Sequence, residues 1–143
     1  MVYSPLSNHF KLRSSQDPST DKEKEDMENV PYASAVGSLM YDMVCTRQDI
    51  AHAVGVVSRF LSNPEREHLE AVKWILRYLQ GTSKLTLSFG SHKPVLVGYT
   101  NSYMTRYEDS RKSTSGYLIT LSSGVVSWQS RLQNCIALST VEA

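Results

Sequence analysis

The chain has 143 residues, 41% of them hydrophobic and 20% charged, which predicts one or two globular domains and excludes a chain disordered or fibrous throughout. Its 15 Lys and Arg side chains nearly balance 14 Asp and Glu side chains, so a dominant basic field for nucleic acid or anionic membrane is excluded, though a local patch is not. No run approaches the roughly 18 apolar residues of a membrane span. The first ten residues lack the basic and apolar regions of a secretory signal, which leaves the localisation open.

Residues 1–30 are predicted to form a disordered leader. They are rich in Ser, Asn, Asp and Lys, and residues 21–29 carry five acidic side chains, two lysines and one apolar side chain. Such a segment buries too little apolar surface to offset the entropy lost on ordering.

The first part of residues 31–82 is predicted to form two amphipathic helices. Pro31 suits the first turn of one, and Asp49 is the expected N-cap of the next. Cys45, at the end of the first helix, is expected to be a reduced, buried thiol. The expected apolar faces are Ala35, Val36, Leu39, Met40 and Met43, then Ile50, Ala53, Val54, Val57, Phe60 and Leu61.

A third helix is predicted after Asn63, with Asn63 as its cap, Pro64 at its first position and Gly81 at its end. Its apolar stripe comprises Leu69, Val72, Ile75, Leu76 and Leu79.

After Gly81 the apolar spacing changes to a period of two, which predicts strands. The expected strands are 85–89, 95–100, 115–121, 125–129 and 134–138, with a tight turn at 122–124. The strand at 95–100 is largely apolar, and this favours a central place in the sheet.

The ionisable residues offer few candidates for chemistry. His9, His52, His68 and His92 share no metal-ligand spacing, and the pair Glu65 and His68 is expected to be exposed on a helix surface. Arg66, Lys73 and Arg77 lie on one side of the third helix and are candidate phosphate contacts.

The interleaved Glu70 favours a solvated face with ion pairs over such contacts. Four aromatic side chains lie on or beside the apolar stripes and are expected to pack in or at the edge of the core: Tyr41, Trp74, Tyr78 and Trp128.

Seven blocks of the chain resemble the polyprotein of copia-type retrotransposons, where the reverse transcriptase thumb and connection lead into the ribonuclease H domain. The blocks are Tyr32-Ala-Ser-Ala-Val-Gly-Ser-Leu-Met40, Arg47-Gln-Asp-Ile-Ala51, Ala71-Val-Lys-Trp-Ile-Leu-Arg-Tyr-Leu79, Gly98-Tyr-Thr-Asn-Ser-Tyr-Met104, Arg111-Lys-Ser-Thr-Ser-Gly-Tyr117, Val126-Ser-Trp-Gln-Ser130 and Ala137-Leu-Ser-Thr-Val-Glu-Ala143. The resemblance implies an α+β chain. Its expected parts are the leader, a three-helix thumb/connection-like cluster at 31–82, and a truncated, incomplete antiparallel sheet of ribonuclease H type at 83–143.

In that family, two magnesium ions held by carboxylates cleave the RNA strand of an RNA–DNA hybrid. The resemblance puts the first catalytic Asp at Asn101 and the second Asp of the same motif at Tyr103. Glu142 matches a neighbour of the catalytic Glu, which would follow the last residue. The expectation is therefore no enzyme, no cofactor and no metal. An unrelated site built from Glu108, Asp109 and Glu142 stays open.

The chain also resembles a copia-derived member of the secreted RxLR-type effectors of oomycete plant pathogens. That family enters host cells and dampens defence or cell death. Two segments match the motif only in part, at Arg59 with Leu61 and at Arg77 with Leu79, since each lacks the final Arg.

Together these features predict a non-catalytic, copia-derived protein that binds a partner. The effector resemblance would make that partner a host protein and the chain a secreted protein acting inside the host cell. A residual nucleic-acid-binding fragment and a relic without selected role both stay open. Weak nucleic-acid binding and no membrane contact are expected. The incomplete sheet should expose an apolar face for a partner or a second copy, at Val95, Val97, Leu118 and Val126.

Overall fold

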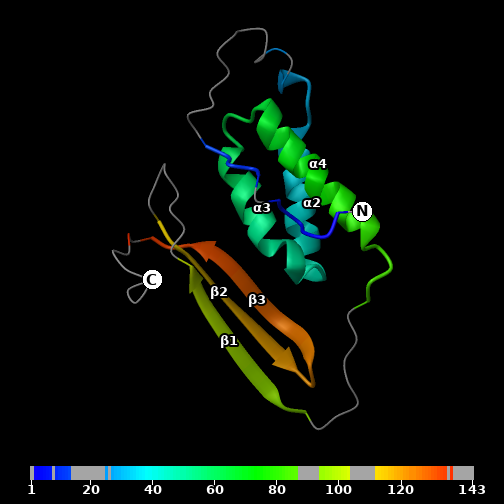
Figure 1. The fold of residues 1–143 in the computed structure, drawn as a ribbon, viewed down its shortest axis with the longest axis vertical. Coiled ribbons are helices and arrows are strands. Elements are labelled where there is room, and N and C mark those ends of the chain that lie inside the picture. The colour runs from blue at the N-terminus through cyan, green and yellow to red at the C-terminus, as the bar shows by residue number, and fades with distance from the viewer. Residues whose placement is uncertain are drawn as a thin grey trace. The chain divides into compact units, whose positions relative to one another are not determined.

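The computed structural model describes residues 2–7, 9–13, 25, 27–86, 94–103, 112–134 and 136. The chain forms two compact units, residues 1–84 and residues 85–143, and each is described here by itself. In the part of the chain that the structure describes, every helix longer than one turn lies in the first unit and every strand in the second (Figure 1). The protein is therefore an α+β protein, as the sequence predicts.

The first unit is built around the helices α2 (Tyr32–Cys45), α3 (Ala51–Val57) and α4 (Arg66–Gly81), which pack against one another (Figure 1). Two short 3-10 helices, η1 (Gln48–Ile50) and η2 (Ser58–Phe60), flank α3. The helical spacing of apolar residues in the sequence thus correctly predicts all three helices. The core consists mainly of Leu12, Tyr32, Val36, Leu39, Ile50, Ala53, Val54, Val56, Val57, Phe60, Ala71, Val72, Ile75 and Tyr78.

The second helix is not the continuous helix expected from residue 50 to residue 61. Its middle alone is α-helical, and Asp49 lies inside η1 instead of capping a helix. At the other end, the hydroxyl of Ser58 donates a hydrogen bond to the carbonyl oxygen of Gly55 at 3.1 Å. This bond from a side chain back to the preceding turn competes with regular helix geometry and accompanies the change to the tighter η2.

Helix α4 begins two residues later than Pro64 predicts. Its N-cap is Glu65, and the backbone N–H of Glu65 donates to Nδ1 of His68 at 3.0 Å, while the Glu65 side chain accepts from the N–H of His68. Both side chains are buried, and the His68 ring stacks on Phe60 with centroids 3.9 Å apart. The expectation of an exposed Glu65–His68 pair is therefore wrong, because this reciprocal cap satisfies otherwise unpaired groups inside the core.

Part of the predicted leader packs on α4. Leu12 is buried in the core, and Phe10 meets Trp74 in an edge-to-face contact. Nε1 of Trp74 donates to the carbonyl oxygen of Ser4 at 3.0 Å, so the indole has both an apolar and a polar contact with the N-terminal segment.

Several side chains expected to be buried in or beside the apolar stripes are exposed instead. Tyr41 is 72% exposed, Met40 and Leu61 are also exposed, and so are Leu76 and the thiol-bearing Cys45. The rest of each stripe fills the core, so the period locates the helices but not the limits of the buried face.

The second unit contains an antiparallel sheet of β1 (Leu96–Tyr103), β2 (Thr114–Leu121) and β3 (Gly124–Leu132), in the order β1-β2-β3 (Figure 1). Ser122 and Ser123 join β2 to β3 with φ angles of 49° and 68°. Two left-handed residues are typical of the tight hairpin turn that matches strand twist, although Asn and Gly adopt it with less strain.

The expected central position of the strand at 95–100 is wrong for the described sheet, because β2 is central and β1 is at the edge. Of the predicted strand 85–89, only Leu85 and Thr86 are described, and neither is in a strand. The predicted strand 134–138 lies mostly outside the described residues.

Candidate functional site

Strand alternation divides the sheet into two faces. Directly paired residues share a face, so Asn101 lies on the same face as Val97, Tyr99, Leu118 and Trp128. This surface is called the Asn101 face. The opposite surface, called the Tyr117 face, carries polar and apolar side chains, namely Leu96, Thr100, Ser102, Ser115, Tyr117, Ile119, Leu121, Gln129 and Arg131.

Asn101, the position at which the family resemblance puts the first catalytic Asp, pairs with Gly116 on β2. A Cβ atom at Gly116 would lie 2.9 Å from the backbone oxygen of Gln129, so only glycine fits opposite Asn101. The exposed Asn101 side chain is a neutral amide. Among the described residues, no three His, Cys, Asp or Glu side chains come together, while Glu108, Asp109 and Glu142 lie outside that part of the chain.

Only two of the four residues of the predicted apolar face lie within the regular pairing of the sheet. Val97, 38% exposed, and the half-buried Leu118 share the Asn101 face. Val126 is the extra residue of a β-bulge opposite the step from Ile119 to Thr120. Val95 precedes β1 near the hairpin turn, where its carbonyl oxygen accepts a hydrogen bond from the N–H of Ser122.

Tyr99, 58% exposed, also lies on the Asn101 face, although it is not among the residues predicted for the apolar face. The signal was present, because Tyr99 is two residues after Val97 in a strand and two before Asn101. The Asn101 face thus combines apolar and aromatic side chains with one amide.

The basic residues of α4 surround an acid. Nζ of Lys73 donates to Oε1 of Glu70 at 2.9 Å, and both side chains are about half exposed. This hydrogen bond, with the nearby charges of Arg77 and Arg66, lowers the pKa of Glu70 below its usual value. All three candidate phosphate contacts therefore act on one carboxylate, which partly neutralises them.

The two partial RxLR segments lie in folded helices. Arg59 is in η2 and Leu61 follows it, whereas Arg77 and Leu79 belong to α4, where Leu79 packs against the core. In the described part of the chain, no helix has both the length and the apolar character needed to cross a membrane.

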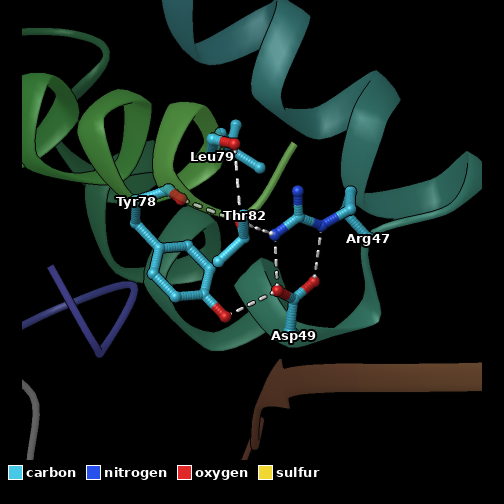
Figure 2. A network of polar contacts seen from close by, with 5 residues as sticks. All are labelled: Arg47, Asp49, Tyr78, Leu79 and Thr82. Atoms are coloured by element: carbon cyan, nitrogen blue, oxygen red, sulfur yellow. Dashed lines mark hydrogen bonds and ion pairs between the residues drawn. The ribbon is translucent and has the colours of Figure 1, made fainter. Parts of the chain in front are cut away.

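A polar network joins the turn after α2 to the end of α4 (Figure 2). Arg47 binds Asp49 through Nε and Nη2 at 3.0 and 2.7 Å, and the hydroxyl of Tyr78 donates to the same carboxylate at 2.8 Å. Nη2 of Arg47 also donates to Oγ1 of Thr82 at 2.7 Å, and that hydroxyl donates to the carbonyl oxygen of Tyr78. The network connects segments 35 residues apart in the sequence and fixes the C-terminal end of α4.

The pKa values in this network follow from burial and hydrogen bonding. Burial, and then the hydrogen bond to Asp49, raises the pKa of Tyr78. For Asp49, burial alone would raise the pKa, but the hydrogen bonds from Arg47 and Tyr78 outweigh it and hold the pKa below its usual value. The carboxylate is therefore charged at neutral pH.

Comparisons with known proteins identify the family. The chain is 62% identical over 142 residues to the retrovirus-related Pol polyprotein from transposon TNT 1-94 of Nicotiana tabacum, a match that covers 99% of this chain. It is 51% identical over 119 residues to the secreted RxLR effector protein 161 of Plasmopara viticola, covering 81% of this chain and 82% of that protein. The chain belongs to the copia-type retrotransposon Pol family.

A third copia-type relative, the Pol polyprotein from transposon RE1 of Arabidopsis thaliana, is 37% identical over 113 residues. The chain spans only 11% of the tobacco polyprotein and 8% of the Arabidopsis one. No protein-family model matches the chain, and no solved structure matches it.

Proposed function

We propose that this copia-type chain acts without catalysis, by binding a partner protein through the Asn101 face of its sheet. The observation that carries the proposal is the chemistry of that face. A neutral amide occupies the position of the expected first catalytic Asp, and exposed apolar side chains flank it at Val97 and Tyr99.

Charge is the reason for proposing no catalysis. A site with two metal ions needs anionic oxygen ligands, because hard divalent cations are held mainly by carboxylates. The Asn101 amide supplies an oxygen without that charge, and in the described residues no cluster of acids replaces it. We infer that the sheet belongs to a ribonuclease H-like domain that has lost its catalysis.

The apolar character of the face is the reason for proposing a protein partner. Exposed apolar side chains that lie together on one surface usually mark a contact with another protein. A nucleic-acid backbone would favour clustered cations instead. Neither Val97 nor Tyr99 has a positively charged neighbour directly opposite, because their partners on β2 are Thr120 and Leu118.

The relative from Plasmopara viticola supports a host protein as that partner. Its name describes a secreted RxLR effector, and the match covers 82% of its length, so in that protein a segment like this one makes up nearly the whole molecule. We infer that this chain is an effector as well, and propose that it suppresses plant defence or cell death from inside the host cell.

The experiment compares two neighbouring residues on opposite faces of β1. Val97→Asp puts a charge on the Asn101 face, and Leu96→Asp puts the same charge on the Tyr117 face, where Leu96 is 67% exposed. Each variant and the unchanged chain are expressed in plant leaf cells in which cell death is triggered. The unchanged chain and Leu96→Asp should suppress cell death, and Val97→Asp should not.

Tyr99→Ser provides a second variant on the Asn101 face that adds no charge, and it should also lose suppression. Hydrogen exchange of the sheet amides identifies any variant that fails to fold. Cell death that proceeds equally with and without the unchanged chain would overturn the proposal and favour a relic. Equal suppression by all variants would overturn the choice of face.

A further inference from the structure

Strand β1 has a row of backbone groups that its pairing with β2 does not use. In the part of the chain that the structure describes, β1 pairs with β2 alone, and every residue from 96 to 102 is exposed. One step beyond the last pair of that register, the N–H of Ser122 donates to the carbonyl oxygen of Val95 at 3.2 Å. Because the direction of these groups alternates along a strand, every second residue after Val95 points toward β2. The residues whose N–H and C=O groups point outward are Leu96, Gly98, Thr100 and Ser102.

This edge lacks the features that normally prevent strands of different molecules from pairing. Natural edge strands are protected by charged side chains, by proline or by a bulge. Strand β1 contains no charged residue and no proline, and its register with β2 is regular throughout. The other edge of the described sheet, β3, contains both Arg131 and the bulge at Val126. The edge of β1 is therefore the one that is open to another strand.

The sequence of β1 is complementary to itself. Two antiparallel copies of β1 can be arranged around a two-fold axis at Tyr99. Leu96 of each copy then lies opposite Ser102 of the other, and Gly98 lies opposite Thr100 in the same way. All four outward residues exchange hydrogen bonds in this arrangement, whereas any other register in phase leaves at least one of them without a partner in β1. Tyr99 meets Tyr99 of the second copy as an aromatic cross-strand pair, and no like charges are opposed.

We propose that β1 pairs with β1 of a second copy in this register, so that two three-stranded sheets form one sheet of six strands. Directly opposite residues of antiparallel strands share a face, and the Asn101 faces of the two copies therefore become continuous. The dimer goes beyond the proposed partner contact, because that contact uses a face of the sheet and the dimer uses its edge. Either proposal can fail alone, since a second copy adds 16.1 kDa to a covalent adduct and a host protein adds its own mass.

Sedimentation equilibrium of the purified whole chain tests the dimer. The mass should approach twice the 16.1 kDa of one chain as the concentration rises. Thr100→Pro removes an N–H that faces the second copy, so the hydrogen bonds between β1 and β2 remain. Two symmetric hydrogen bonds between the copies are lost, and the dissociation constant of the dimer should rise about thirtyfold. Thr100→Val keeps the N–H and is the matched control, for which the dissociation constant should not change.

Disulfide crosslinking tests the register. In a chain that carries Cys45→Ser and Cys135→Ser, Tyr99→Cys puts two thiols on residues whose Cα atoms lie about 4.5 Å apart, within the range of a disulfide. Val97→Cys adds a thiol to the same face, but its two copies are separated by about 13 Å along the strands. Only the variant at position 99 should therefore form a covalent dimer on a non-reducing gel.

Three results would overturn the proposal. The first is a chain that sediments as a monomer at its highest soluble concentration. The second is an equal dissociation constant for the unchanged chain and Thr100→Pro, which would assign the dimer to another surface. The third is crosslinking at both positions or at neither. Hydrogen exchange of the sheet amides reports whether each variant is folded, and if Thr100→Pro is not, the crosslinks decide.

Discussion

Replacing Asp49 by Ala tests the network that joins the turn after α2 to the end of α4. The change removes the bonds to Nε and Nη2 of Arg47 and to the hydroxyl of Tyr78 (Figure 2). The side chains of Arg47 and Asp49 are 20% and 33% exposed, so solvent screens their ion pair and about 0.5 kcal/mol is a reasonable value for it. The bond from the Tyr78 hydroxyl to a carboxylate adds about 1.5 kcal/mol. The total of about 2 kcal/mol corresponds to a fall of about 8–16 °C in the unfolding temperature of a unit of this size.

The stability that Asp49→Ala loses should depend on pH. Since the pKa of Asp49 is lower in the folded chain than in the unfolded chain, its stabilisation is complete above the unfolded value of about 4. It is lost as the pH falls through the lower, folded value. The difference in unfolding free energy between the unchanged chain and Asp49→Ala should therefore be constant near neutral pH and shrink in acid.

Thermal unfolding of the whole chain, followed by far-ultraviolet circular dichroism, measures this difference, because the helices longer than one turn in the described residues all lie in the first unit. Glu70→Ala is the matched control. It removes an exposed ion pair with Lys73, and should cost about 0.5 kcal/mol or less. An Asp49→Ala protein that unfolds at the same temperature as the control would refute the assigned role, as would a loss that persists unchanged in acid.

Three further changes test other parts of the structure. Gly116→Ala should disrupt the sheet, because the new Cβ meets the backbone oxygen of Gln129 at 2.9 Å, whereas Gly98→Ala has open space and should be tolerated, as judged by hydrogen exchange. Burial lowers the pKa of His68, so the unfolding free energy should fall as the pH drops through about 6.5, and His68→Gln should reduce that dependence in urea titrations at several pH values. The chain should not cleave an RNA–DNA hybrid with magnesium, and Asn101→Asp should not restore cleavage in a gel assay, since one carboxylate does not form a two-metal site.

The sequence predicts the helices well where burial follows a simple period. Val36, Leu39, Val72 and Ile75 recur at helical spacing, and all four are buried in the core. Tyr41 shows the limit of the pattern, because it lies beside the stripe in the sequence but is exposed on the helix surface. Which neighbouring helix covers a position is a tertiary property that the period of one helix does not contain.

The helix ends were harder to predict because their partners are distant or unusual. Asp49 has the chemistry of an N-cap, but its carboxylate binds Tyr78, 29 residues later, and Arg47. Asn63 and Pro64 are typical of a helix start, but the buried pair of Glu65 and His68 supplies the cap instead.

For the candidate site, the alternation of the strands puts Val97 and Leu118 on one face, as the apolar pattern suggested. A β-bulge interrupts the alternation at Val126. Neither glycine nor proline occupies the bulged position, so the sequence does not indicate the bulge there. Gly116 becomes informative only when the register is known, because its role depends on the backbone of Gln129 across the strand.

The most direct test of the central claim is photo-crosslinking inside plant cells in which the chain suppresses cell death. A benzophenone amino acid replaces Val97 on the Asn101 face or, as the matched control, Leu96 on the Tyr117 face. The account predicts one discrete protein adduct from position 97 and none from position 96. No adduct at position 97, equal adducts at both positions, or an adduct with nucleic acid would contradict it.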